Sequence, residues 1–131
     1  MSRAEIETVV TEYRDALERH DSDAAMALWA DDIVVHVNGR NVLSGTFSGK
    51  ARFQQTQRWI FLEHDSGVDV VEVHDLLISD DHAVALIEER AHRGEAALQY
   101  RRLLIFHVRN GHISELWCIA EDPYALDQFW E

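Results

Sequence analysis

Residues 103–117 read LLIFHVRNGHISELW, and this stretch carries the clearest local folding signal in the chain. Two runs rich in β-branched and aromatic residues flank Asn110-Gly111, and Asn-Gly is a preferred dipeptide for the two-residue turn of a β-hairpin. We therefore expect antiparallel strands over residues 97–108 and 112–120. The second strand is apolar at every position from 116 to 120, which predicts a strand that is covered on both faces.

The same strand-like pattern extends upstream to residue 68. It predicts two further strands over residues 68–78 and 82–92, each followed by a hairpin turn. A shorter β-branched strand is expected at residues 33–37, and the turn dipeptide Asn38-Gly39 ends it.

Before residue 66, apolar residues recur mainly at helical spacing. This spacing predicts a first helix up to His20, a short helix capped by Asp21 or Ser22, and a third helix that begins near Ser48-Gly49. Asp122-Pro123 predicts a last short helix, because proline is favoured at the first helical position. The order of elements predicts one α+β domain over residues 1–131, with helices packed on one face of a mostly antiparallel sheet.

Acidic residues outnumber basic ones: the chain has 24 Asp and Glu, 12 Lys and Arg, and a formal net charge of -12. Such a surface repels phosphate backbones and anionic lipids, so no nucleic-acid or membrane partner is expected. The segment MSRAEIETVV lacks the apolar stretch of a signal peptide, and Cys118 is the single cysteine. We therefore expect a cytoplasmic protein without an intrachain disulfide.

The apolar pattern of the last strand also bears on assembly. The helices can cover one face of the sheet, and a chain of 131 residues has no second layer for the other face. We therefore expect a homodimer through the sheet, and the alternative is a monomer whose sheet is poorly covered.

Arg102 shares a strand face with Leu98, Leu104 and Phe106. An unpaired guanidinium among apolar side chains would be costly, so Arg102 must pair with a carboxylate such as Glu88, or with an anionic or carbonyl ligand.

Glu88, Arg90 and His92 lie on one face of the neighbouring strand. They would form a polar stripe in a cavity if that face is concave, or rim charges at a dimer interface if it is convex. No histidine pair has metal-ligand spacing of the H-E-x-x-H kind, so neither a metal nor a cofactor is expected.

Four strings together resemble the SnoaL-like and ketosteroid-isomerase-like proteins of the nuclear-transport-factor-2-like (NTF2-like) superfamily. These strings are EYRDALERHDSDAAMALWADDIVVHVNG, LSGTFSGK, LLIFHVRNGHISELW and DPYALDQFW, and the likeness covers nearly the whole chain. The resemblance implies a cone, in which the N-terminal helices pack in the concave face of a curved, mostly antiparallel sheet beside a deep pocket. It says little about activity, because this fold carries many functions.

The chain departs from the ketosteroid isomerases at two of three catalytic positions. Tyr13 matches their catalytic tyrosine, but Val37 stands where they have the general base, Asn38 where they have the following proline, and Leu104 where they have a protonated aspartate. The resemblance therefore does not imply steroid isomerisation by that mechanism.

The limonene-epoxide-hydrolase branch provides a second comparison. His36-x-Asn38 resembles the tyrosine and asparagine that hold the attacking water there, and Arg90-x-His92 resembles an Arg-x-Asp step. Ile119 lies near the position of the second aspartate, so both acids of that site are missing.

His36 and Tyr13 each have two possible roles. If the first strand lines a cavity, the His36 imidazole can act as an acid or base near neutral pH. Alternatively, it is a strand-edge histidine bonded to a backbone carbonyl. Tyr13, on the buried stripe of the first helix, needs a hydroxyl partner that either a pocket mouth or the backbone can supply.

These residues predict a cofactor-independent acid/base enzyme of the isomerase, cyclase or hydrolase type, acting on a hydrophobic oxygenated small molecule. His36 would be the acid/base, and Tyr13 and Arg102 would polarise a carbonyl or hydroxyl. The alternative is a non-catalytic ligand-binding module, or a dimeric interaction module, of the same fold. The expected substrate contacts are Asn38 (which is also a turn residue), Trp59, Glu88, Arg90, His92, Leu104, Phe106, Leu116 and Cys118.

Overall fold

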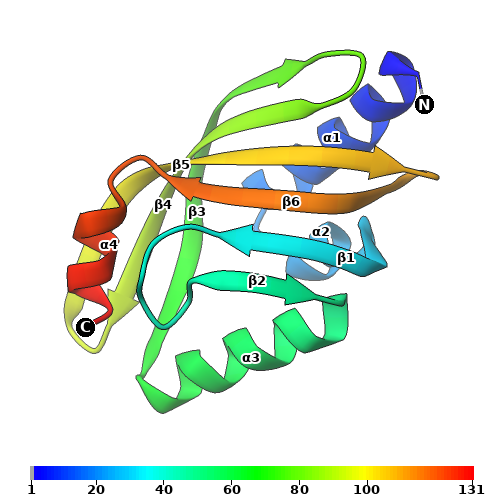
Figure 1. Cartoon of the computed structure of the whole chain (residues 1–131). Coiled ribbons are helices and arrows are strands. Elements are labelled where there is room, and N and C mark those ends of the chain that lie inside the picture. Colours follow the sequence, from blue (N-terminus) through cyan, green and yellow to red (C-terminus); the bar gives the residue numbers. More distant parts are fainter. Residues whose placement is uncertain (1) are drawn as a thin grey trace.

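The structure, a computed structural model, describes residues 2–131. A curved six-stranded sheet with the order β2-β1-β6-β5-β4-β3 forms its framework (Figure 1). β1 runs parallel to β6, and all other neighbouring strands are antiparallel. The strands are β1 (Trp29–Val37), β2 (Gly45–Ser48), β3 (Ser66–Ile78), β4 (Ala83–Arg93), β5 (Ala96–Arg109) and β6 (His112–Ala120).

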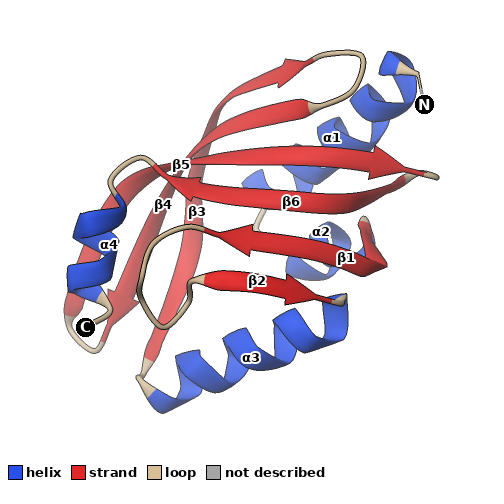
Figure 2. Ribbon diagram, viewed as in Figure 1, coloured by secondary structure: helices blue, strands red, loops and turns tan. Residues whose placement is uncertain are grey.

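The helices lie mainly on the concave face of this sheet. Figure 2 shows α1 and α2 behind the sheet, α3 beside β2, and α4 beyond the end of β6. The helices are α1 (Arg3–Glu18), α2 (Ser22–Ala27), α3 (Lys50–Glu63) and α4 (Pro123–Phe129).

The helix α1 begins with a capping box and buries one face. The Ser2 hydroxyl accepts the Glu5 N–H at 3.2 Å, and the Glu5 carboxylate accepts the Ser2 N–H at 3.3 Å. These bonds satisfy backbone donors that have no partner inside the helix. The buried side of α1, which includes Val10 and Tyr13, packs against β3 and β4 and forms the main core with the inner face of the sheet.

The structure confirms the predicted meander of four strands, with ends that differ by at most two residues. Asn110 and Gly111 have positive φ angles of 53° and 79°, as a type I′ turn requires. The first predicted strand was too short, because β1 already starts at Trp29. The strand β2 was not expected, since four residues between turn formers give almost no periodic signal, and β2 is defined by its pairing with β1.

The two faces of the sheet are distinguished by burial along β5. Tyr100, Leu104 and Phe106 face the helices and are buried, whereas Leu103 and Ile105 point outward and are half-buried. The predicted inner face of this strand is therefore confirmed. The same alternation continues across β4, β6 and β1, and it decides which side chains reach the interior.

Candidate small-molecule site

A cavity of about 730 Å³ lies between the helices and the concave face of the sheet. Exposed residues of α2 and α3, namely Asp23, Arg58 and Leu62, also line it, so it opens to solvent between these helices. Its wall is largely apolar and includes Leu17, Met26, Val37, Phe53, Leu104, Leu116 and Cys118. The volume is in the range of small-molecule sites.

Tyr13 brings a hydroxyl to this cavity from α1. Its oxygen accepts a hydrogen bond from the indole Nε1–H of Trp29 at 3.2 Å. Within residues 2–131, no protein acceptor takes the phenolic proton of Tyr13. Burial raises the pKa of the Tyr13 hydroxyl well above its usual range, against a smaller opposite effect of the Trp29 hydrogen bond. Tyr13 therefore remains protonated at neutral pH and can donate to a bound ligand.

Glu89 and Arg102 form a buried ion pair on the floor of the cavity. Arg102 Nη1 lies 3.4 Å from Glu89 Oε1, and the side chains are only 14% and 10% exposed. The Tyr100 hydroxyl donates to the same carboxylate oxygen at 2.9 Å. The guanidinium lies over the Tyr100 ring, 5.5 Å from its centroid. These contacts hold a carboxylate and a guanidinium inside a largely apolar cavity.

Arg102 also has an unused donor. Its Nε is buried and has no hydrogen-bond partner within residues 2–131. Burial on its own would lower the pKa of Arg102, but Glu89, with smaller effects of Cys118 and Tyr100, raises it above its usual value. The guanidinium is therefore charged, and a buried N–H without an acceptor is costly unless a ligand oxygen or water supplies one.

Of the predicted catalytic residues, Tyr13 and Arg102 line the cavity, but His36 does not. The prediction that His36 faces the pocket is wrong, because β1 buries Val35 and Val37 on its inner face and turns His36 outward. There His36 Nε2 lies 2.6 Å from Glu115 Oε2, and Nδ1 lies 3.1 Å from the Thr46 hydroxyl. The ring stacks on Trp117.

Three predicted contacts are found in the cavity wall: Leu104, Leu116 and Cys118. Burial raises the pKa of the Cys118 thiol to about 12, so this residue is present as the neutral thiol and adds to the apolar wall.

The polar stripe of Glu88, Arg90 and His92 lies on the outer face of the sheet, which corrects its expected place in the pocket. The alternation along β4 buries Glu89 and Ala91 on the inner side. The outer residues between them therefore point away from the cavity. The likeness of Arg90-x-His92 to an epoxide-hydrolase step thus does not extend to this cavity.

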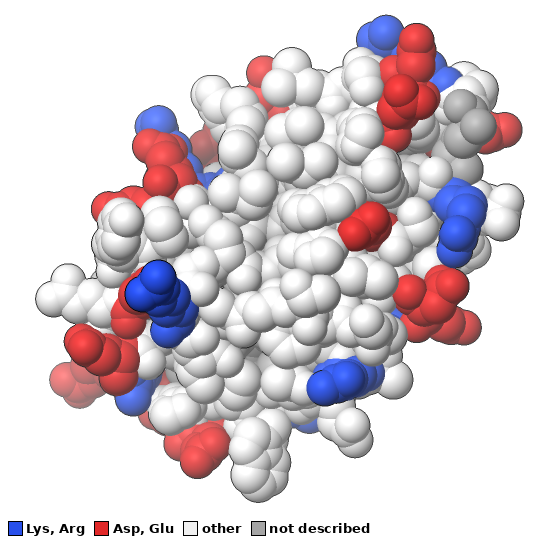
Figure 3. Space-filling model, in the orientation of Figure 1, with Lys and Arg blue, Asp and Glu red and all other residues white. Residues whose placement is uncertain are grey.

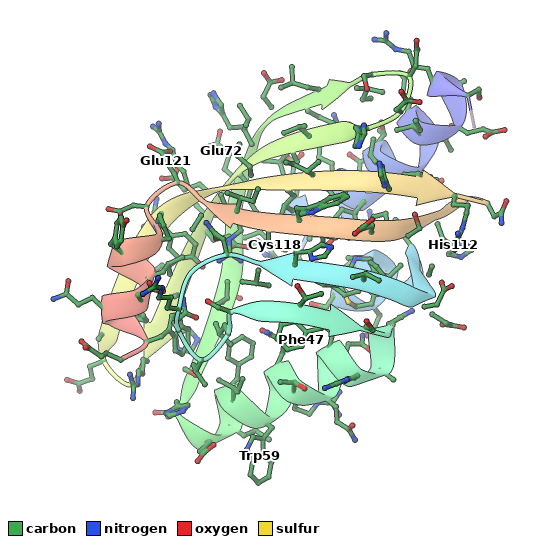
Figure 4. All side chains as sticks on the ribbon, viewed as in Figure 1. Phe47, Trp59, Glu72, His112, Cys118 and Glu121 are labelled. Atoms are coloured by element: carbon green, nitrogen blue, oxygen red, sulfur yellow. The ribbon has the colours of Figure 1, made fainter. Side chains whose placement is uncertain are left out.

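Three further predicted contacts also lie elsewhere. Trp59 is 69% exposed and points away from the sheet on α3 (Figure 4). Phe106 is buried in the core, where its ring meets the Tyr13 ring edge to face at 5.5 Å. The Asn38 amide bonds the backbone of Ala120 in both directions, at 3.3 and 2.8 Å, and so extends the pairing of β1 with β6.

Glu89 was missed in the sequence, and Glu88 was named as the partner of Arg102 instead. The alternation in this strand contains the missing signal: residues 83, 85, 87 and 91 are small or apolar, and Glu89 interrupts that row. A carboxylate in a buried row needs a partner. Arg102 is likewise the charged residue in the buried row of the next strand. The two opposite charges could therefore have been predicted to pair.

The fold and the cavity define an α+β protein of the NTF2-like type with an internal pocket. The sequence profile of the SnoaL-like domain matches residues 10–116, and the chain belongs to this family. No curated protein is similar enough in sequence to match the chain. Within residues 2–131, no helix combines the length and apolar character that a membrane span needs.

Solved structures support the fold at low sequence identity. Bal32a from a soil-derived mobile gene cassette is 22% identical, with a TM-score of 0.82 and coverage of 98% of each chain. An NTF2-like protein from Burkholderia xenovorans is 15% identical, with a TM-score of 0.75 and coverage of 100% of this chain and 98% of the other. An LEH-like epoxide hydrolase from M. tuberculosis is 20% identical, with a TM-score of 0.66 and coverage of 96% and 87%.

Proposed function

We propose that the inner cavity binds a hydrophobic, oxygenated small molecule and catalyses a cofactor-independent proton-transfer reaction on it, of the isomerase, cyclase or hydrolase type. One observation carries the proposal. Tyr13, Arg102 and Glu89 line the same largely apolar cavity, and within residues 2–131 neither the Tyr13 hydroxyl proton nor the buried Arg102 Nε–H has a protein acceptor. Donors of this kind stabilise negative charge that develops on a carbonyl or epoxide oxygen.

In this proposal the roles are redistributed from His36 to residues inside the cavity. Tyr13 and Arg102 donate hydrogen bonds to the substrate oxygen. Glu89 removes or returns a proton at a neighbouring substrate atom, because it is the carboxylate buried among these donors. The apolar wall excludes water and fits the hydrocarbon part of the substrate. The epoxide hydrolase among the similar structures agrees with a substrate of this class.

Binding without turnover is the second candidate function. The Glu89 carboxylate already contacts Arg102 and accepts a hydrogen bond from Tyr100. Both contacts are made to the same oxygen, Oε1, and hold the carboxylate in place as a structural partner of Arg102. The cavity would then recognise the oxygen of a ligand through Tyr13 and Arg102 and leave the ligand unchanged.

Ligand binding and proton transfer can be measured separately. We expect β-tetralone, styrene oxide or lawsone to raise the melting temperature, and the bound ketone to exchange its acidic C–H protons with D₂O faster than in buffer, as followed by NMR. Glu89→Gln should slow this exchange by about 10²–10⁴-fold and keep ligand affinity within a few-fold. Tyr13→Phe should lower the ligand affinity and slow the exchange, because it removes a donor to the ligand oxygen.

The matched control is His36→Gln, which alters the outer face alone and should leave binding and exchange unchanged. Loss of exchange in this variant would contradict the proposed roles. Binding of all three probes without accelerated exchange or epoxide opening would favour the binding module, and no binding of any probe would overturn both functions.

We also propose that two copies pair through the outer face of the sheet. Figure 3 shows that the face over β6, β1 and β2 is largely uncharged, with one acidic side chain inside it and most other charges at its rim. Outward residues of the central strands, such as Ile105, Trp117 and Ile119, are half-buried in the single chain. A broad face with few charges on a chain with a net charge of -12 supports cover by a second copy.

Ile119→Glu tests this pairing. It should convert a species of about twice 15.1 kDa into one of 15.1 kDa in light scattering after size exclusion, because it places a carboxylate without a partner in the proposed interface. Trp59→Glu, which places the same charge on exposed α3, should leave the mass unchanged. A wild-type protein that already elutes at 15.1 kDa would rule the dimer out.

A further inference from the structure

A row of polar side chains crosses the outer face of the sheet, away from the inner cavity. The Nε2 atoms of His82 and His107 lie 2.5 Å apart. His107 Nδ1 lies 3.7 Å from Glu115 Oε1, and the other oxygen of Glu115 lies 2.6 Å from His36 Nε2. The row follows from the register: Ala83 pairs with Phe106 and His107 pairs with Glu115, so His82, directly before β4, lies next to His107 of β5 and Glu115 of β6.

We propose that His82 and His107 form a binding site for a divalent transition-metal ion, with Glu115 as the carboxylate that orients His107. Imidazole nitrogen is a ligand that Zn²⁺, Ni²⁺ and Cu²⁺ prefer. The site is separate from the cavity, and it does not depend on the proposed reaction.

The contact with Glu115 determines which nitrogen of His107 is available. Glu115 lies 3.7 Å from His107 Nδ1, and a carboxylate can only accept, so this contact favours the tautomer in which Nδ1 carries the proton. In the neutral ring, Nε2 then has the lone pair, and this lone pair points toward His82. Metal-binding histidines commonly use this arrangement, in which a carboxylate fixes the tautomer and the ring orientation.

His36 gains a role in this arrangement. Its Nε2 contacts the second oxygen of Glu115, and Thr46 and the Trp117 ring fix the imidazole itself. The carboxylate is thereby held between two imidazoles. Trp117 also meets the His107 ring edge to face at 5.3 Å, which limits the movement of that ring. Both supports make His107 a preorganised ligand.

Binding of a metal ion between the two rings requires a small movement of His82. Tetrahedral Zn²⁺ with bonds of about 2.0–2.1 Å separates two ligating nitrogens by about 3.3 Å. His82 lies in the exposed turn before β4, so rotation of its ring can open the distance. Within residues 2–131, no group of three or more His, Cys, Asp or Glu could hold a metal ion. The site therefore supplies two protein ligands and leaves the other positions to water or to an added donor.

Titration of tag-free protein with ZnCl₂ and NiCl₂ by isothermal calorimetry tests this site. We expect one ion per chain, and at least a 10-fold loss of affinity in His82→Gln and in His107→Gln. Glu115→Gln keeps both histidine ligands, and its metal affinity should fall about 10-fold, as is typical when a carboxylate that orients a metal-bound histidine is removed. His112→Gln is the matched control, because this exposed histidine at the start of β6 contacts the Asn110 carbonyl and none of the residues of the site (Figure 4).

A second measurement locates the ion. In ¹⁵N spectra of imidazole-labelled protein, Zn²⁺ should shift the Nε2 resonances of His82 and His107 and leave His112 unchanged. The proposal would be overturned if His82→Gln and His107→Gln bound the metal as tightly as the wild type. It would also be overturned if His112→Gln lost as much metal affinity as these variants, or if the wild type bound no metal. Unchanged thermal melting of each variant would show that a loss of affinity is not a folding defect.

Discussion

Arg102→Met is expected to lower the free energy of unfolding by about 3–5 kcal/mol, because it leaves Glu89 as an uncompensated charge in the interior. The Glu89 side chain is only 10% exposed, so solvent replaces the lost partner only in part. Only the Tyr100 hydroxyl would still donate to it. Urea denaturation followed by tryptophan fluorescence measures the change.

Two variants isolate the cause of this effect. Arg101→Met changes the neighbouring, exposed arginine on the outer face and should stay within about 0.5 kcal/mol of the wild type. Glu89→Gln combined with Arg102→Met removes both charges and should recover much of the lost stability, since a neutral amide can still accept the Tyr100 hydrogen bond. If Arg102→Met were as stable as Arg101→Met, the Glu89–Arg102 ion pair could not be buried as described.

Phe106→Ala is expected to destabilise the protein by about 3–5 kcal/mol through loss of buried surface and the cavity that remains. Phe106 is 1% exposed and packs against the Tyr13 ring, so its removal affects the core between α1 and β5. The effect should appear as a lower urea midpoint with an unchanged slope.

Tyr124→Ala on α4 is the matched control, because this aromatic ring is 82% exposed and its truncation should change stability by less than about 0.5 kcal/mol. The comparison also tests the assignment of Phe106 to the core. If Phe106→Ala mainly weakened ligand binding and left stability unchanged, the residue would line the site, as its sequence pattern suggested.

The sheet was largely predictable because its connections are local. The Asn110-Gly111 turn, the period of two along β5 and the Asp122-Pro123 start of α4 each depend on a few neighbouring residues. The parallel pairing of β1 with β6 was not predictable in the same way. It joins segments about 80 residues apart, and no turn connects them.

The candidate site was only partly predictable, since its residues depend on which strand face points inward. In β4, the alternating row of small apolar residues places Glu89 on the inner face, although Glu88, Arg90 and His92 were predicted to line the pocket. In β1, both faces carry valine, so the period alone could not orient His36. Pairing with β6 and packing against the helices decided its direction.

The sequence by itself determined the α+β class, the four-strand meander, the family and the inward direction of Tyr13 and Arg102, because local turns and strong alternation encode them. Only the tertiary structure decided that Glu89 is the partner of Arg102, that His36 faces outward, and that His82, His107 and Glu115 meet. These contacts join different strands through their register. A shift of one residue would turn every side chain of a strand to the other face, and register is set by the packing of the whole sheet against its helices.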